Sequence, residues 1–286
     1  MKPIAKRQAK PSQRRTVLSV ALIATLCATS PASVSATPLL AQQQPPQAEG
    51  CPHLLSQAPA RIIPANVGKD QMSLTFIGHA TFLMETPAGL KVATDYNDYV
   101  RPADPPDVIT MNRAHSTHFT HNPPAGIKHV LRGWDPRGGA AAHDVTVKDM
   151  RIRNVVTNLR DWNGGTDYRG NSMFVFEASL LCVAHLGHLH HELTQEHLKQ
   201  LGRIDVALVP VDGSMTLTRP AMLRVVKSMG APMVVPMHFF GRSSLNDFLN
   251  LAREEKFDVM MSQSATLILS RDMLPKRPTV MVLPGH

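Results

Sequence analysis

The chain reads Asn112-Arg113-Ala114-His115-Ser116-Thr117-His118 directly after the apolar run 107–111, whose β-branched residues are typical of a strand. Two histidines three positions apart share one face of a helical turn. We therefore expect His115 and His118 on a loop that leads from a strand into a helix. Alone, a pair at this spacing is more typical of an exposed or hydrogen-bonded turn than of a metal site.

Two further histidines also follow apolar, strand-like runs. His188 comes shortly after residues 180–184, within a His-rich tract, and His238 comes directly after residues 232–237. Taken singly, the tract is also typical of an exposed turn, and a lone histidine after a buried strand is more often a core residue. The ends of neighbouring strands meet at one edge of a sheet, however, and neutral imidazole is the commonest side-chain metal ligand. We predict that four side chains hold one divalent transition metal, with Zn²⁺ the expected ion: His115, His118, His188 and His238.

The rhythm of the chain predicts an α/β fold. Short β-branched and apolar runs dominate the first part of the domain, and strands alternate with helices in the second. The expected strands are 73–77, 81–86, 90–94, 107–111, 127–131, 149–157, 172–177, 180–184, 204–210, 233–236, 257–261, 265–270 and 279–283. The expected helices are 194–201, capped by Thr194; 220–229, ended by Gly230; and 244–254, capped by Ser244. Strand-rich segments followed by strand–helix alternation indicate layered, mixed sheets.

The first 36 residues have the pattern of an export signal. A basic stretch precedes the apolar run 17–28, and Val34-Ser35-Ala36 fits a cleavage site of small residues. The segment 13–18 contains Arg14 and Arg15 and resembles a twin-arginine signal; an ordinary secretory signal is the alternative. Residues 37–71, rich in Gln, Pro and Ala, are expected to form a linker or arm, and 72–286 the folded domain. These features predict a periplasmic protein.

Composition argues against several classes of partner. Six of the 30 basic residues lie within the first fifteen positions, so the other 24 nearly balance the 22 acidic ones. A nearly neutral mature chain gives no reason to expect nucleic acid or an anionic membrane as partner. No other stretch is apolar enough to span a membrane in the mature form. With 5% aromatic residues, recognition by stacking is also not expected.

Two cysteines remain after removal of the signal. Cys51 and Cys182 could form a disulfide in an oxidising compartment. Cys182, however, lies in an apolar strand-like run, where a buried free thiol is common.

Several of these segments together carry a resemblance to a known family. Residues 77–83 with Asp95, then 185–189, 202–213 and 236–238, match the metallo-β-lactamase superfamily in order and spacing. The chain most resembles the branch that contains ascorbate-phosphate lactonase and N-acyl-phosphatidylethanolamine phospholipase D. The resemblance implies an α/β fold, a four-layer αβ/βα sandwich with two mixed β-sheets and the metal at one edge of both sheets.

The ligands depart from the family pattern His-x-His-x-Asp-His. Its first His is Arg113 here and its Asp is Thr117, while a later His is Arg160 and a bridging Asp is His188. Guanidinium groups have no lone pair for a metal. At about 4 Å and an effective dielectric constant of about 20, each would also repel a unit of positive charge by about 4 kcal/mol. The resemblance therefore implies that one metal site is lost and that one nitrogen-rich site remains.

We expect an exported metal-dependent hydrolase in which a hydroxide on a single metal attacks a small ester, lactone, amide, phosphoester or activated halide. Arg113 and Arg160 are candidate catalytic residues that could bind an anionic group of the substrate, or could form ordinary salt bridges. His79 is a third candidate catalytic residue, which could face the pocket or hold a loop, and Asp95 could orient a ligand histidine.

A second hypothesis is a non-catalytic periplasmic binding or metal-handling protein on a hydrolase scaffold. Loss of the family's water-orienting Asp at Thr117 favours it, as would a closed site with four histidine ligands. A redox-active iron site is a third possibility.

Overall fold

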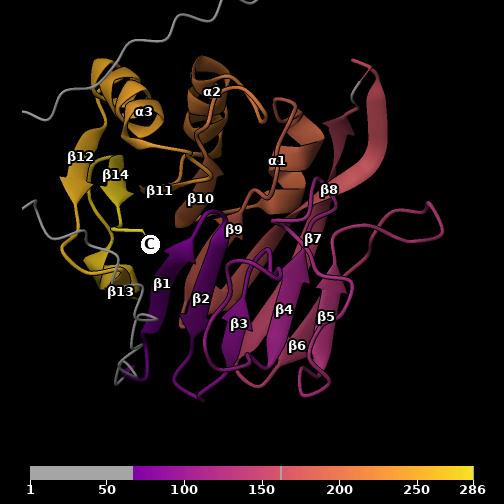
Figure 1. Ribbon diagram of the computed structural model, residues 1–286. Coiled ribbons are helices and arrows are strands. Elements are labelled where there is room, and N and C mark those ends of the chain that lie inside the picture. Colours follow the sequence, from indigo (N-terminus) through magenta and orange to yellow (C-terminus); the bar gives the residue numbers. More distant parts are fainter. Residues whose placement is uncertain (1–66, 162, 286) are drawn as a thin grey trace, which may run out of the picture. The chain divides into compact units, whose positions relative to one another are not determined.

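Two mixed β-sheets lie at the centre of the structure, a computed structural model that describes residues 67–161 and 163–285 (Figure 1). The six-stranded sheet has the order β13-β1-β2-β3-β4-β5, and the eight-stranded sheet has the order β12-β14-β11-β10-β9-β8-β7-β6. The strands of the first sheet are β1 (Met72–Gly78), β2 (Thr81–Glu85), β3 (Lys91–Ala93), β4 (Val108–Met111), β5 (His129–Arg132) and β13 (Thr266–Leu269). Those of the second are β6 (Asp144–Val147), β7 (Met150–Arg160), β8 (Thr166–Ala178), β9 (Leu181–His185), β10 (Val206–Pro210), β11 (Met233–Met237), β12 (Asp258–Met261) and β14 (Thr279–Val282).

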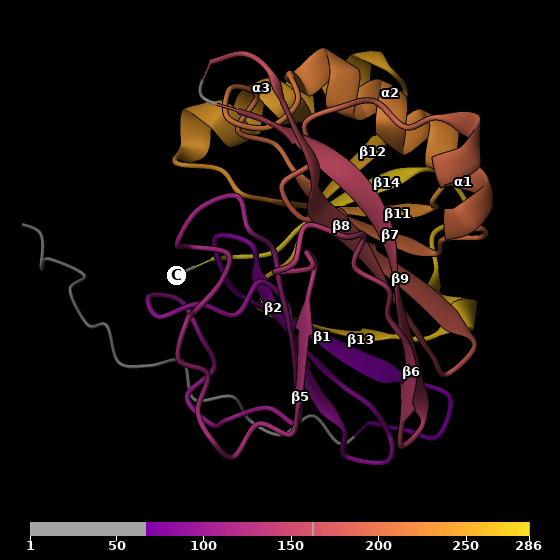
Figure 2. The same ribbon diagram turned by 90° about the vertical axis from the view of Figure 1, so that its right-hand side faces the viewer.

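Three α-helices cover the outer face of the eight-stranded sheet (Figure 2). They are α1 (Gln195–Leu201), α2 (Arg219–Met229) and α3 (Arg242–Glu254); a short 3₁₀ helix, η1 (Arg271–Met273), follows β13. Thr194 caps α1 as expected, accepting a hydrogen bond from the His197 amide, and Gly230 ends α2 in the left-handed conformation. The expected cap of α3 at Ser244 is wrong, because the helix begins after Gly241 and already includes Ser244.

Apolar side chains fill both faces of the eight-stranded sheet. One buried cluster lies between the sheets and includes Phe82, Phe174 and Phe176; another joins the eight-stranded sheet to the helices and includes Phe248. Burying each such ring contributes roughly 1.5–3 kcal/mol. Strands that pack on both faces read as continuous apolar runs, and β10 and β11 are buried at every position. These two strands therefore hold their carboxyl ends rigidly.

The predicted α/β class with two mixed sheets is confirmed. Strand β6 was not expected, because its residues alternate between exposed and half-buried positions at the sheet edge. Strands β7 and β8 extend beyond the expected bounds and pair with each other over a long antiparallel ladder. The helical layer expected on the outer face of the six-stranded sheet does not occur among residues 67–161 and 163–285. On that outer face, Phe119 and Trp134 from connecting loops pack against a third and smaller buried apolar cluster.

Some expectations fall on residues that the structure does not describe. The export signal, Cys51 and most of the expected arm 37–71 lie outside the described residues, so the disulfide stays a prediction. Cys182 is half-buried on β9, and burial raises the pKa of its thiol. Within the described ranges, no helix combines the length and apolar character needed to cross a membrane.

Candidate metal centre

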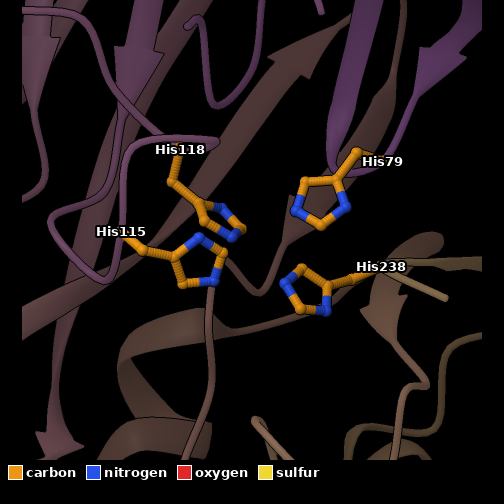
Figure 3. A group of neighbouring side chains, drawn as sticks. All are labelled: His79, His115, His118 and His238. Atoms are coloured by element: carbon orange, nitrogen blue, oxygen red, sulfur yellow. The ribbon is translucent and has the colours of Figure 1, made fainter. Parts of the chain in front are cut away.

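Loops at the ends of strands from both sheets bring histidines together. His79 lies in the turn between β1 and β2, His115 and His118 lie after β4, and His238 follows β11 directly. One nitrogen from each of these four rings lies within 4.8 Å of the others, and the rings face one another (Figure 3). Four histidines from between sequence positions 79 and 238 thus lie together at the common edge of the two sheets.

The segment that carries His115 and His118 is a tight turn and not the start of a helix, which corrects the expected strand-to-helix loop. The His118 amide donates to the His115 carbonyl at 2.9 Å, and the Asn112 amide donates to the His118 carbonyl at 3.0 Å. The chain then continues to β5 without a helix. This turn still places both imidazoles on the same side, with ring centroids 4.4 Å apart.

Two of the four imidazoles are oriented by buried carboxylates. His118 Nδ1 lies 2.5 Å from Asp95 Oδ2, and His238 Nδ1 lies 3.1 Å from Asp212 Oδ1. Because a carboxylate accepts, each histidine carries its proton on Nδ1 and presents the lone pair of Nε2. Both Nε2 atoms are buried and have no hydrogen-bond partner. Leaving a buried polar atom unpaired costs about 1–3 kcal/mol, so this arrangement calls for a ligand.

Each carboxylate is itself held in place. Asn112 donates to Asp95, and the Asp212 side chain accepts from the Ser214 and Met215 amides and from the Thr216 hydroxyl. Burial raises the pKa of Asp95 to about 6. Burial also opposes ionisation of Asp212, but hydrogen bonds from His238 and Thr216 hold its pKa well below the usual range. Both groups are therefore acceptors at neutral pH.

The imidazoles of His79, His118 and His188 are neutral at physiological pH. Burial, with the neighbouring His238 and His115, lowers the pKa of His79 to about 3, and burial lowers the pKa of His118 and His188 well below the usual range. Crowding several imidazoles in a low-dielectric site disfavours protonation of each. Neutral rings are the form that binds metals.

His188 lies beside the group of four. Its Nε2 is 3.0 Å from His115 Nε2, and its ring centroid is 4.8 Å from that of His238. The backbone amide of His188 donates to Asn171 Oδ1. Gly187 directly before it has a φ of +60°, and an added Cβ there would lie only 2.4 Å from the same oxygen. Only glycine fits this close approach without displacing neighbours.

Three residues around the centre adopt left-handed backbone conformations that are uncommon outside glycine. The φ angles are +51° for His79, +41° for Asp95 and +53° for His238. The His238 amide also donates to the His79 carbonyl at 2.7 Å, which ties the two strained turns together. Backbone strain of this kind persists where surrounding contacts enforce it and is concentrated at functional sites.

The two arginines lie outside the group of four histidines. Arg113 is partly exposed and forms an ion pair with Asp167 on β8. One terminal nitrogen of Arg160 donates to the carbonyls of Ser214, Met215 and Thr216, at 3.3, 3.1 and 2.8 Å. Arg160 therefore holds the loop that follows Asp212, and only Arg113 is paired as an ordinary salt bridge. Their catalytic roles stay predictions.

Sequence reasoning named three of the four histidines that lie together here, and it did not foresee two parts of the arrangement. His79 was expected near the pocket but not among the groups close enough to share an ion, and Asp212 was not singled out as the partner of His238. The position of Asp212 could have identified it as a partner of His238. Asp212 follows the buried strand β10 and lies beside the end of the parallel strand β11, which His238 follows. His185, in contrast, is buried with Nε2 2.8 Å from the Ala80 carbonyl and has a structural role.

The residues present fit a first-row transition metal. Clustered imidazole nitrogens, two of them on rings that a carboxylate orients from behind, form the usual surroundings of Zn²⁺ in proteins. Mg²⁺ and Ca²⁺ prefer oxygen ligands, which this group of four does not supply.

An α/β sandwich of two mixed sheets with a histidine centre at their common edge defines the metallo-β-lactamase class of folds. The chain belongs to the β-lactamase superfamily: the family profile described as "Beta-lactamase superfamily domain" matches residues 73–238. The superfamily prediction is thereby confirmed, and the narrower branch stays a prediction.

The chain is also similar to individual proteins that are named as hydrolases. A metal-dependent hydrolase of Methanoculleus marisnigri is 25% identical over 182 residues, which cover 59% of this chain and 81% of the relative. A similar hydrolase of Methanosphaerula palustris is 24% identical over 184 residues, which cover 59% of this chain and 84% of the relative. The crystal structure of a protein from Thermotoga maritima, described as a Zn-dependent hydrolase of the metallo-β-lactamase superfamily, has a TM-score of 0.57 and 28% identity, covering 75% of this chain and all of the other.

Proposed function

We propose that this protein is a metal-dependent hydrolase that uses one divalent transition metal, Zn²⁺ in the first instance, on a small-molecule substrate. The observation that carries the proposal is the pair of buried, unpartnered Nε2 atoms of His118 and His238, each backed by a carboxylate. The names of the relatives from Methanoculleus marisnigri and Methanosphaerula palustris and the description of the Thermotoga maritima structure, which all describe metal-dependent hydrolases, support the same reaction type.

His118 and His238 would hold the ion, with further ligands from the neighbouring histidines. A bound Zn²⁺ supplies Lewis-acid activation of water and of the bond to be hydrolysed. Asp95 and Asp212 keep the two imidazoles in the required tautomer, and burial keeps water from competing for these hydrogen bonds. Where the family has an acid, the side chain of Thr117 offers a hydroxyl, which lies 2.9 Å from His79 Nε2.

Two arginines favour a site for a single ion. Arg113 and Arg160 stand where the family has histidine ligands for a second metal, and guanidinium groups offer no lone pairs. The Arg113 guanidinium pairs with Asp167 and is partly exposed, so it is available to exchange that partner for an anionic substrate group. Phe240 borders the centre and is 64% exposed, with its ring centroid 5.3 Å from that of His238. These side chains would accommodate a small ester, lactone, amide, phosphoester or activated halide with an apolar or anionic substituent.

We also propose that the protein acts in the periplasm. The basic stretch, apolar run and small-residue site within residues 1–36 support export.

The experiment that tests the hydrolase proposal measures bound metal and turnover together. Purified protein loaded with Zn²⁺ should carry one ion per chain and hydrolyse at least one member of a panel of aryl esters, lactones and phosphodiesters, while His238→Ala should lose both properties. His121→Ala, which changes an exposed histidine outside the centre, is the matched control and should retain both. Stoichiometric metal without any turnover would favour the binding or metal-handling alternative, and absence of metal would refute the metal-dependent hydrolase.

A further inference from the structure

A continuous chain of hydrogen bonds runs from a backbone amide into the metal centre. The Arg160 amide donates to His190 Nδ1 at 2.6 Å, His190 Nε2 lies 2.5 Å from His188 Nδ1, and His188 Nε2 lies 3.0 Å from His115 Nε2. Beyond it, the Thr117 hydroxyl lies 2.8 Å from His115 Nδ1 and 2.9 Å from His79 Nε2. Every ring nitrogen of His190, His188 and His115 thus has one partner.

The first contact fixes the direction of those that follow it, as far as the Thr117 hydroxyl. A backbone amide can only donate, so His190 Nδ1 accepts and its proton lies on Nε2. His190 then donates to His188 Nδ1, which places the proton of His188 on Nε2. His188 donates in turn to His115 Nε2, and His115 carries its proton on Nδ1 and donates to the Thr117 hydroxyl.

These proton positions show which histidines of the centre have a lone pair free for a metal. His188 and His115 have used their lone pairs, because each accepts through one nitrogen and donates through the other. Freeing His115 Nε2 for a metal would leave the His188 proton without its acceptor. Reversing the chain instead would bring a protonated His190 Nδ1 against the Arg160 amide. The first change leaves a buried donor on His188 unmatched, at a cost of about 1–3 kcal/mol. The second sets two donors against each other at 2.6 Å.

His79 is different because its partner is a hydroxyl. The proton of Thr117 rotates freely about its C–O bond, so the lone pair of His79 Nε2 becomes available without any change in the rest of the chain. Thr117 can still accept from His115 in that state. The position of His79 is also fixed: its carbonyl accepts from the His238 amide at 2.7 Å, and its ring centroid lies 4.2 Å from that of His238.

We infer that His79, His118 and His238 hold the ion, and that His115 and His188 lie in an outer chain of hydrogen bonds. This inference rests on the proposed metal-dependent function. It differs from the prediction made from the sequence, in which His115 and His188 were ligands and His79 was not. Three imidazole ligands leave a fourth position open, which is the arrangement of catalytic and not of structural zinc sites.

Cysteine substitution with Co²⁺ as the probe tests the assignment directly. A thiolate bound to Co²⁺ gives an intense near-ultraviolet charge-transfer band, which a thiol outside the coordination sphere does not give. We expect this band in Co²⁺-loaded His79→Cys and, as the positive control, in His118→Cys. We expect none above the wild-type baseline in His115→Cys or His188→Cys. A band in His115→Cys or His188→Cys with none in His79→Cys would overturn the inference.

A second measurement needs no variant and covers the case in which a substitution prevents folding. Imidazole ¹⁵N resonances of the wild-type protein report which nitrogen carries each proton. We expect His115 to keep its proton on Nδ1 when Zn²⁺ is added, while the Nε2 resonances of His79, His118 and His238 shift. A shift of His115 Nε2 with none at His79 would contradict the inference but leave the hydrolase proposal standing. Failure of the wild-type protein to bind either metal would contradict both.

Discussion

One carboxylate sets the orientation and tautomer of each of two imidazoles in this centre. Asp212 accepts a hydrogen bond from His238 and at the same time organises the loop that follows β10. Asp95 has the same relation to His118. In each case Nε2, the nitrogen that the carboxylate does not contact, would bind the metal. The carboxylate therefore influences the metal indirectly, through the orientation and tautomer of the imidazole.

Asp212→Asn should weaken Zn²⁺ binding by roughly 10- to 100-fold, the usual effect of losing a group that orients a ligand. The amide is similar in size but no longer offers a charged acceptor to His238 Nδ1. Isothermal titration with Zn²⁺ measures the change. Asp205→Asn is the matched control, because Asp205 is a buried carboxylate at the other end of β10, where it accepts from the Cys182 amide. Equal weakening in both variants would show that general destabilisation is the cause.

Gly187→Ala should destabilise the fold by about 3 kcal/mol or more. A Cβ at this position would lie 2.4 Å from Asn171 Oδ1 and 2.5 Å from Asn112 Nδ2, in addition to the strain of φ = +60°. Gly89→Ala separates the two effects, since Gly89 has φ = +67° and nothing within 4 Å of the added atom. That variant should lose only about 1–2 kcal/mol, the cost of a left-handed alanine. Urea denaturation of both variants measures the difference, and equal losses would rule out the steric explanation.

At the residue scale, the sequence predicts which histidines gather but not which nitrogen of each is free. His118 and His238 could be predicted because each follows an apolar run that ends at the shared sheet edge. The role of His79 could not, because it depends on a turn whose strained backbone is held by contacts from another sheet, among them the bond from the His238 amide. The tautomer of His115 depends on the Arg160 amide, 45 positions away in the chain.

Among the elements, the short helix α1 is held at both ends by side chains. Thr194 and His197 form a reciprocal capping box at its start. At its end, Arg153 on β7 donates to the carbonyls of Gln200 and Leu201, both at 2.7 Å. A helix of this length is not stable alone, so these contacts and the burial of Leu201 determine whether it forms.

Arg153→Met should therefore destabilise the protein by about 1–3 kcal/mol, because it removes a charged donor from two helix carbonyls and leaves Glu177 with one cation fewer. Arg151→Met is the matched control. Arg151 also pairs with Glu177, but it is exposed and donates to no helix carbonyl, so its loss should cost less than about 1 kcal/mol. Thermal unfolding followed by circular dichroism compares the two, and similar midpoints would argue against the capping role.

The bounds of the elements were predictable where burial and local signals agree. Strands β10 and β11 and helix α2 were expected within a residue or two, because uninterrupted apolar runs and a terminal glycine mark them. Strand β6 and the extensions of β7 and β8 were not, because their polar residues are stabilised by pairing with a neighbour and not by their own sequence pattern.

At the scale of the whole molecule, export should depend on the two adjacent arginines of the N-terminal segment. Replacing Arg14 and Arg15 by lysine keeps the charge of the basic stretch and removes the feature that distinguishes a twin-arginine signal. Cell fractionation should find the wild-type protein in the periplasm and the double variant in the cytoplasm. Lys6→Arg with Arg7→Lys, which exchanges two basic residues outside the arginine pair and keeps the charge, is the control. Normal export of the double variant would indicate an ordinary secretory signal.

Metal binding should also stabilise the fold as a whole, because the three inferred ligands come from both sheets. His79 and His118 follow strands of the six-stranded sheet, and His238 follows β11 of the eight-stranded sheet. An ion bound only by the folded state at 100 times its dissociation constant adds about 2.7 kcal/mol to the free energy of unfolding. For a domain of this size, that corresponds to a rise of roughly 5–10 °C in Tm. Differential scanning calorimetry with and without Zn²⁺ measures the rise, which His118→Ala should abolish and the exposed-site variant His121→Ala should retain. If Zn²⁺ raised the Tm of His118→Ala as much as that of the wild type, the ion would bind elsewhere on the protein.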